Sequence, residues 1–258
     1  MTQLVNVFLR GGADGLSIFA PVSDPAYLSA RPTLAVRSED SIDVGIGGFA
    51  VHPAAPRIAE LIRSRTAAAV PAAGFDGQTR SHFESQANLE SAVGLDGSYT
   101  EGGGLGWLSE VLSAGSGDTL APFRAVAVGS VSLPMSMAGT NDALGAPSPD
   151  ALRLGALTFK GFGTGARYEV VAVDDSPTGA DMVDLWRGSA GAPPITGVSV
   201  EGAAAVLERL STAPIEVPDS SLFGMGESAP VFAAASALLA ADLGTEIVQI
   251  DMGGWDTH

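Results

Sequence analysis

The stretch Glu246-Ile-Val-Gln-Ile-Asp-Met-Gly-Gly-Trp-Asp-Thr-His258 decides how the rest of this chain is interpreted. Residues 247–250 predict a short buried strand, and Asp251 follows at its carboxyl end. Two glycines then bend the chain, and Asp256 and His258 come two residues apart. Side chains at positions i and i+2 of an extended or looped backbone lie on the same side. A carboxylate and an imidazole on one side of a loop, beside the carboxyl end of a strand, suit a divalent metal ion or acid–base chemistry.

The composition indicates a folded, acidic protein without thiol chemistry. The chain has 258 residues, of which 46% are hydrophobic and 16% charged, so it can bury a large core and is not disordered as a whole. Its formal net charge of -16 disfavours nucleic acids and anionic membranes as partners. The acidity either helps to capture a divalent cation or simply forms a solvated surface. The absence of cysteine excludes disulfides, a thiol nucleophile and a Cys-ligated zinc site.

Neither an export signal nor a membrane span is predicted. Residues 2–9 run directly into a strand pattern, without a basic head or a cleavage site. The longest apolar run, residues 231–241, is too short to cross a bilayer, so we expect a buried helix and no membrane insertion.

Strand patterns alternate with helix patterns along the chain, which predicts βαβ units, an α/β fold and a mostly parallel sheet. The expected strands cover residues 4–9, 67–70, 123–128, 156–160, 168–173 and 247–250. The expected helices cover residues 56–66, 79–90, 105–113, 180–187, 200–210 and 230–243. In the first of these helices, Ile58, Leu61 and Ile62 are expected on one face, as in an amphipathic helix. Residues 17–50 predict an irregular excursion, and residues 214–226 a loop.

Asp14 lies in a glycine-rich turn just after the first expected strand, at the sheet edge where α/β proteins bind ligands. An aspartate in such a turn also commonly bonds its own backbone, and Asp251 has the same alternative as a turn residue. Together with Asp256 and His258, these residues form one site only if the first and last strands pair.

The segment Thr79-Arg-Ser-His-Phe-Glu84 has two interpretations. Ser81 and Glu84 fit a capping box at a helix start, which is a structural role. Thr79 or Ser81 could instead be a nucleophile beside the backbone N–H groups of the helix start, with Arg80 as a fork that binds phosphate or sulfate.

The other signals are weaker. His52 and His82, taken singly, favour ordinary structural hydrogen bonds, whereas His258 with Asp256 favours a functional role. The stretch Gly161-Phe-Gly-Thr-Gly-Ala166 resembles a dinucleotide fingerprint, but a strand pattern follows it instead of a helix, so we expect no dinucleotide site there.

Four stretches in order resemble the bacterial domain-of-unknown-function family 1501: residues 9–17, 48–53, 80–86 and 254–258. The resemblance implies a three-layer α/β/α sandwich like that of alkaline phosphatases and sulfatases, with a metal site at the carboxyl ends of the strands. It also implies twin-arginine export, and therefore a periplasmic or extracellular location.

The resemblance suggests roles for individual residues. Asp14 matches the aspartate after the first strand, Thr79 or Ser81 the nucleophile, and Asp256 with His258 a late ligand pair. Ala87 departs from the family, which often has an acidic residue there. Members also usually continue beyond the Trp-Asp-Thr-His motif, so we expect one domain over residues 1–258 that is incomplete at its carboxyl end.

These inferences lead to an exported, metal-dependent hydrolase of phosphate or sulfate esters as the first hypothesis. Zinc, manganese, magnesium or calcium would bind at Asp14, Asp256 and His258, with Asp251 as a further ligand, and Arg80 and His82 would hold the anion. The second hypothesis is a non-catalytic surface or assembly protein that binds a glycan or a protein partner. The third is a plain α/β domain whose motif residues are caps and turns.

Overall fold

The computed structural model describes residues 3–74, 81–91, 106–115, 124–129, 133–139, 143–146, 157–162, 167–172, 218–220, 226–241 and 243–256. The chain forms two compact units. Residues 12–75 form the unit that we call the insert, and residues 1–11 with 76–258 form the main unit. The prediction of a single domain over residues 1–258 stays a prediction.

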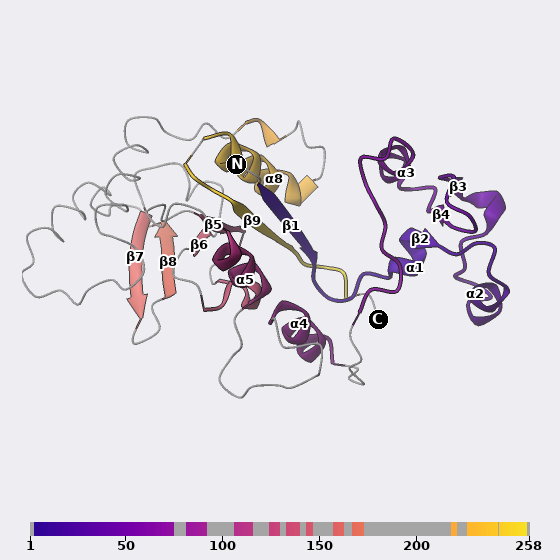
Figure 1. Ribbon diagram of the computed structural model, residues 1–258, viewed down its shortest axis with the longest axis horizontal. Helices are drawn as coiled ribbons and strands as arrows, with labels where there is room; N and C mark the ends of the chain where they lie inside the picture. Colours follow the sequence, from indigo (N-terminus) through magenta and orange to yellow (C-terminus); the bar gives the residue numbers. More distant parts are fainter. Residues whose placement is uncertain are drawn as a thin grey trace, which may run out of the picture. The chain divides into compact units, whose positions relative to one another are not determined.

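A six-stranded sheet forms the centre of the main unit (Figure 1). Its strands, in spatial order, are β1 (Leu4–Leu9), β9 (Ile247–Met252), β5 (Ala125–Val128), β6 (Ala143–Ala146), β8 (Arg167–Ala172) and β7 (Leu157–Phe162). All neighbouring pairs are parallel except β7 and β8, which are antiparallel. The prediction of a mixed α/β fold with a mostly parallel sheet is confirmed.

The first and last strands of the described chain lie side by side. β1 and β9 pair in parallel, from Leu4 opposite Ile247 to Leu9 opposite Met252. The condition for a shared site at their carboxyl ends is therefore met. β9 runs two residues further than predicted, so Asp251 lies within the strand, opposite Phe8, and not after it.

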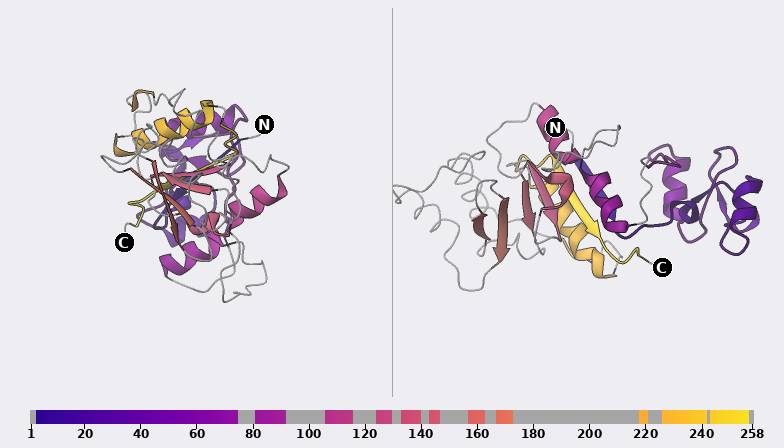
Figure 2. Two further views of the ribbon diagram at one scale, coloured as in Figure 1. Left: turned by 90° about the vertical axis from the view of Figure 1, so that its left-hand side faces the viewer. Right: turned by 90° about the horizontal axis from the view of Figure 1, so that it is seen from below.

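Helices lie on both faces of this sheet (Figure 2). α8 (Ala229–Ala240) covers one face, and α5 (Trp107–Ala114) and α4 (His82–Glu90) lie on the other. All three helices were predicted, with ends that differ by a few residues. Ser228 stands at the N-cap position of α8, but its side chain makes no capping hydrogen bond.

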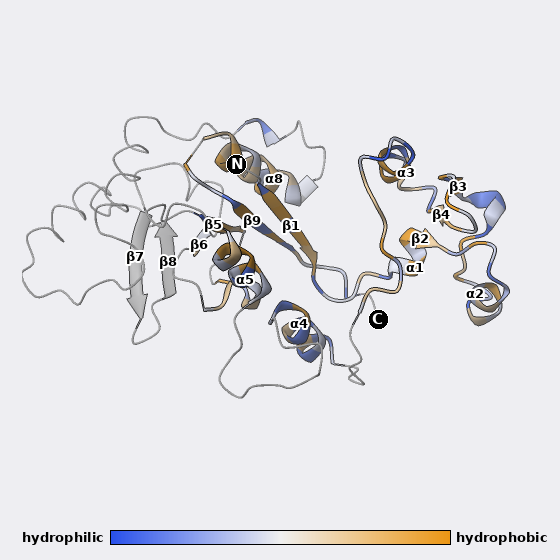
Figure 3. Cartoon of the chain, viewed as in Figure 1, coloured by the Kyte–Doolittle hydropathy of each residue, from blue (hydrophilic) through white to orange (hydrophobic). Residues whose placement is uncertain are grey.

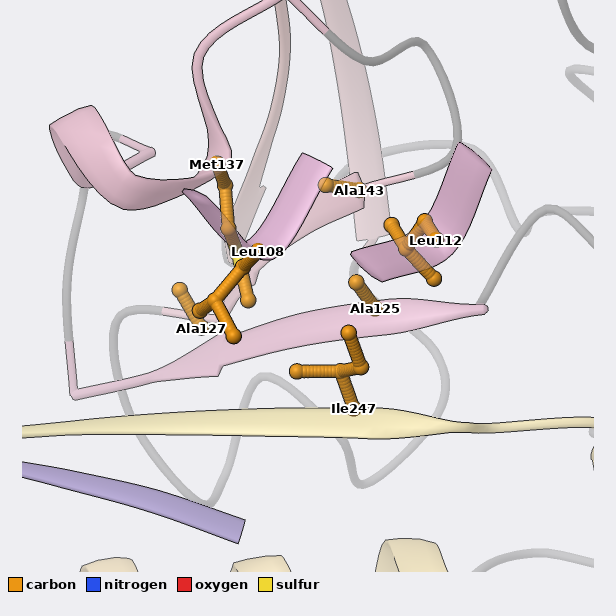
Figure 4. Close-up of a cluster of buried hydrophobic side chains, with 7 residues drawn as sticks. All are labelled: Leu108, Leu112, Ala125, Ala127, Met137, Ala143 and Ile247. Carbon is orange, nitrogen blue, oxygen red and sulfur yellow. The ribbon is translucent and has the colours of Figure 1, made fainter. Parts of the chain in front are cut away.

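Small side chains let α5 approach the sheet closely (Figure 4). The cluster consists of Leu108, Leu112, Ala125, Ala127, Met137, Ala143 and Ile247. Side chains alternate along a strand, so the valines at positions 126 and 128 of β5 face the opposite side, where α8 lies. Figure 3 shows that α8 is hydrophobic over most of its surface, as expected for a buried helix, whereas α4 is mainly hydrophilic.

The insert contains a second sheet that the sequence did not predict. Short antiparallel strands pair in the order β2 (Phe19–Ala20), β4 (Ala50–Val51) and β3 (Ile42–Asp43). The helical elements of the insert are α1 (Gly15–Ile18), α2 (Pro25–Ala30), η1 (Ser38–Asp40) and α3 (Pro56–Arg63). The expectation of an irregular segment over residues 17–50 was therefore wrong in part, because strands of two residues are too short to show an alternating pattern. The strand expected over residues 67–70 is absent, and Val70 is exposed.

The helix α3 was predicted correctly, but of the three large residues on its predicted apolar face only Ile62 is buried. Ala59 and Ile62 are buried against Val44 and Val51. Ile58 and Leu61 remain 42% and 48% exposed. The buried side of α3 is therefore formed by Ala59 and Ile62, which are three residues apart. It is not formed by all three of the large apolar residues.

The strands expected over residues 156–160 and 168–173 are present as β7 and β8. They pair as an antiparallel hairpin, which the sequence did not predict. The strand β8 follows the glycine-rich stretch of residues 161–166, as the sequence predicted for this position. The helices expected over residues 180–187 and 200–210, and most of the loop over residues 214–226, lie outside the described residues. In the described part of the chain, none of the helices has the length and apolarity needed to span a bilayer.

Candidate functional site

The chain after β9 folds back over the end of β1. The Arg10 backbone N–H donates to the Met252 carbonyl over 2.8 Å, and the Trp255 N–H donates to the Arg10 carbonyl over 3.3 Å. Gly11 has a φ of 111°, and a Cβ atom there would lie 2.5 Å from the backbone nitrogen of Asp256. Only glycine allows this approach. The turn after β1 therefore fixes the position of Asp256 at the carboxyl edge of the sheet.

The start of α4 reaches the same place. Ser81 is the N-cap residue, and its hydroxyl accepts a hydrogen bond from the Glu84 N–H over 3.3 Å, as the capping motif predicted. Nδ1 of the next residue, His82, lies 3.8 Å from Oδ1 of Asp256. The two side chains are 35% and 45% exposed, so solutes can reach them. A carboxylate and an imidazole thus meet at this edge, from α4 and from the segment after β9.

From the sequence, Asp256 was expected to act together with His258. His82 was expected to make a structural hydrogen bond or to hold the anion. The contact between His82 and Asp256 was missed because no local pattern connects two residues so far apart in the chain. The scarcity of histidine, with three in 258 residues, was the one available signal.

Arg10 holds α4 against the strands through a network that the sequence analysis did not identify. Its guanidinium bonds both oxygens of Glu90, over 2.7 and 3.0 Å, and Oε1 of Gln86 over 3.3 Å. It also pairs with Oδ2 of Asp251 over 2.9 Å. Partial burial disfavours the charged form of Arg10, but the bonds to Glu90 and Asp251 outweigh this and raise its pKa above the ordinary value. Arg10 therefore stays charged and links three elements.

Asp251 is part of this network. Its Oδ2 pairs with Arg10, and its Oδ1 accepts a hydrogen bond of 2.6 Å from the side-chain amide of Gln249. The side-chain oxygen Oε1 of Gln249 in turn accepts a hydrogen bond of 2.5 Å from the side-chain amide of Asn6. Both carboxylate oxygens thus bond protein donors, which is a structural role. The assignment of Asp251 as a metal ligand stays a prediction.

Asp14, in the insert, shows the turn role that was its alternative. Its carboxylate caps α1 by accepting from the Leu16 N–H, and it also accepts from the Ser17 hydroxyl over 2.6 Å. Arg31 binds both of its oxygens, over 2.5 and 3.1 Å. The bonds from Arg31, more than any other cause, lower the pKa of Asp14. His52 of the same unit accepts a structural hydrogen bond from the Ala54 N–H, as expected. The metal role of Asp14 stays a prediction.

Three predicted site residues, Thr79, Arg80 and His258, lie outside the described residues. Within the described part, the structure brings together no group of three or more histidine, aspartate or glutamate side chains able to hold a metal ion. His82 and Asp256 supply two donors of the right chemistry, and His258 follows Asp256 by two residues in the sequence. Two imidazoles and one carboxylate are a donor set that suits zinc at a catalytic centre.

Comparison with known proteins adds no relative. No family model, curated protein sequence or solved structure matches this chain.

Proposed function

We propose that the carboxyl edge of β1 and β9 is the active site of a metal-dependent hydrolase of phosphate or sulfate esters. The observation that carries this proposal is the placement of His82 and Asp256, 3.8 Å apart, at the edge where open α/β sheets bind ligands. The proposed fold is a three-layer α/β/α sandwich of the alkaline phosphatase type. We also propose, from the resemblance, that the chain is a bacterial member of family 1501. The location proposed with it is the periplasm or the cell exterior.

Asp256, His82 and His258 would hold the cation, for which zinc, manganese, magnesium and calcium are the candidates. The bound cation would neutralise charge on the ester and lower the pKa of the attacking hydroxyl. Ser81 lies at the N-terminus of α4, where backbone N–H groups and the helix dipole favour an anion. We propose Ser81 as the nucleophile, with Thr79 as its alternative and Arg80 as the anion-binding fork.

The net charge of the chain supports a cation requirement. A protein of charge -16 repels a phosphate or sulfate ester in solution. The site must therefore offer local positive charge, which a divalent ion, Arg80 and the start of α4 would together supply.

One observation favours the second candidate, a non-catalytic surface or assembly protein that binds a glycan or a protein partner. The Ser81 hydroxyl accepts the Glu84 N–H, so this serine already has a purely structural use. The two candidates differ in what Ser81 must do.

Substitution of Ser81 separates these two uses. Asparagine caps a helix about as well as serine but has no hydroxyl to attack an ester. In the hydrolase, Ser81→Asn should keep the thermal stability and lose at least about a hundredfold in turnover of aryl phosphates or aryl sulfates. Ser81→Ala should in addition lose about 1 kcal/mol of stability. Full activity in Ser81→Asn would exclude Ser81 as the nucleophile, and Thr79→Val would then test the alternative.

Metal binding is tested on the same protein by calorimetric titration with each of the four cations. His82→Ala, Asp256→Ala and His258→Ala should each weaken binding by about tenfold or more. The matched control is His52→Ala, which removes an imidazole from the insert and should leave the affinity unchanged. Parent protein that binds none of the cations would exclude the metal-dependent hydrolase, and parent protein that binds metal but leaves the esters intact would favour the second candidate.

A further inference from the structure

We infer that Arg10 is the positioning residue that holds the start of α4 beside Asp256, and that its guanidinium is a clamp between elements and not an anion-binding group. The inference deepens the proposed function and rests on it for the chemistry of the site. The clamp itself can be tested without any metal or substrate.

The helix α4 needs such a clamp because apolar packing holds it weakly. Glu90 is its one buried residue, while Phe83 is 85% and Leu89 48% exposed. A helix of mainly polar surface gains little from hydrophobic burial and needs specific polar contacts to keep its place. Gln86 and Glu90, four residues apart and so on one face of the helix, are the side chains that bond Arg10.

The same guanidinium reaches β9, and its own backbone joins it to β1. Arg10 follows β1 directly, and its carbonyl accepts the N–H of Trp255, the neighbour of Asp256. Its Nη2 pairs with Asp251, which Gln249, 1% exposed, holds from the other side. One residue thus connects the strand ends, the segment that carries Asp256 and the helix that carries His82.

Arg10 has little capacity left for a substrate anion. Nη1 donates to Gln86 and Glu90, and Nη2 to Glu90 and Asp251, so four of the five guanidinium N–H donors are engaged. Binding a phosphate or sulfate through the two-pronged fork would break the contact with Glu90, whose side chain is 6% exposed and would lose its partner.

The chain has no cysteine, so an engineered pair reports the geometry without background. The double variant His82→Cys with Asp256→Cys is oxidised under mild conditions in chelator-treated buffer, and the rate of disulfide formation is followed. Arg10→Met in this background should slow the reaction on the order of tenfold or more, because the helix start no longer stays close to residue 256. Arg10→Lys, which keeps one charged contact, should recover part of the rate. Arg57→Met is the matched control, because it breaks an exposed ion pair with Glu60 in the insert and should leave the rate unchanged.

A second variant guards against misfolding of Arg10→Met. Glu90→Gln keeps the shape of the side chain but removes its charge. Like Arg10→Met, it should lower the rate of disulfide formation between residues 82 and 256. Equal rates in the parent and in either folded variant would overturn the clamp. The anion-binding alternative predicts instead that Arg10→Met weakens inorganic phosphate binding while the disulfide forms at the parent rate.

A zinc titration separates the clamp from the proposed function. If Arg10 acts through His82, then Arg10→Met should weaken zinc binding in the parent protein but not further in a His82→Ala background. Fully additive losses would contradict positioning through His82. Absence of zinc binding in the parent would overturn the proposed function, while the disulfide rates would still decide the clamp.

Discussion

Two carboxylates of this protein form ion pairs with arginines, but their exposure to solvent is very different. The pair of Asp14 with Arg31 lies in the insert, with 45% of the Asp14 side chain exposed. The pair of Glu90 with Arg10 lies in the main unit, with 6% of the Glu90 side chain exposed. Exposed pairs contribute little to stability, whereas breaking a buried pair leaves a charge without its partner and is costly.

The Asp14 pair should give a small, pH-dependent contribution to the stability of the insert. Arg31 lowers the pKa of Asp14 from its ordinary value of 3.8, so the folded state favours the ionised form. The contribution is therefore complete above about pH 5 and is lost as pH falls through 3.8 toward the lowered value. Because the side chain is 45% exposed, solvent screening limits it to about 0.5–1 kcal/mol. Urea unfolding of Asp14→Asn should show this loss at pH 7 and a smaller loss at about pH 3.

Asp24→Asn is the control for this experiment. Asp24 caps α2 by accepting the Ala26 N–H over 2.8 Å, and asparagine caps nearly as well. Its effect should stay within a few tenths of a kcal/mol at both pH values. An Asp14→Asn variant that behaved in the same way would show that Arg31 adds nothing in solution.

Gly11 should tolerate no side chain. Gly11→Ala places a methyl group 2.5 Å from the Asp256 nitrogen and 2.7 Å from its Cβ, in addition to the cost of a φ of 111°. We expect a loss of about 2–3 kcal/mol in unfolding free energy and weaker metal binding, because Asp256 must move. Gly254→Ala is the control, since it has a φ of 85° but open space around the new methyl group. It should cost about 1 kcal/mol. Equal losses in both variants would exclude the steric contact with Asp256.

The sequence predicted those elements whose local pattern and tertiary environment agree. α8 is largely apolar and packs mostly in the interior, the first four residues of β9 are buried, and α4 begins after the capping Ser81. The short strands of the insert carry no such pattern, because their pairing is decided by distant segments. The face of α3 was mispredicted because large apolar residues are frequent on protein surfaces, so their spacing alone did not identify the buried side.

The corrected face of α3 leads to a direct prediction. Ile62→Ala should destabilise the insert by about 2–4 kcal/mol, because Ile62 is 7% exposed within a packed cluster. Ile58→Ala makes the same chemical change at a side chain that is 42% exposed, and it should cost less than about 1 kcal/mol. Hydrogen exchange of the α3 amides measures both effects within the full chain. A larger effect at Ile58 would restore the face predicted from the sequence.

At the scale of the whole molecule, the sequence predicted the sheet edge at which Asp256 lies better than it predicted which side chains meet there. The α/β pattern predicted parallel strands, but it left open whether β1 and β9 are neighbours. Their pairing in the structure brings Asp256 to the end of β1. The contact between His82 and Asp256 depends on the placement of α4, which the clamp of Arg10 decides. A network of this kind joins residues from three separate stretches of the chain, residues 6–10, 82–90 and 249–256, and leaves no periodic trace in the sequence.

The net charge of -16 sets the conditions under which a specific cation site can be recognised. Repulsion between the many acidic side chains destabilises the folded chain. Salt screens this repulsion, because the Debye length falls from about 30 Å at 0.01 M salt to about 8 Å at 0.15 M. Sodium chloride alone should therefore raise the thermal midpoint by a few degrees. Millimolar magnesium or calcium will act partly in the same way. Micromolar zinc adds almost no ionic strength, yet at about a hundredfold excess over its dissociation constant it should stabilise a real site by about 2.7 kcal/mol. Scanning calorimetry at fixed 0.15 M salt should therefore show a zinc-dependent rise that His82→Ala and Asp256→Ala remove and His52→Ala keeps. A rise that follows ionic strength alone, and is equal in all three variants, would assign the acidity to a solvated surface.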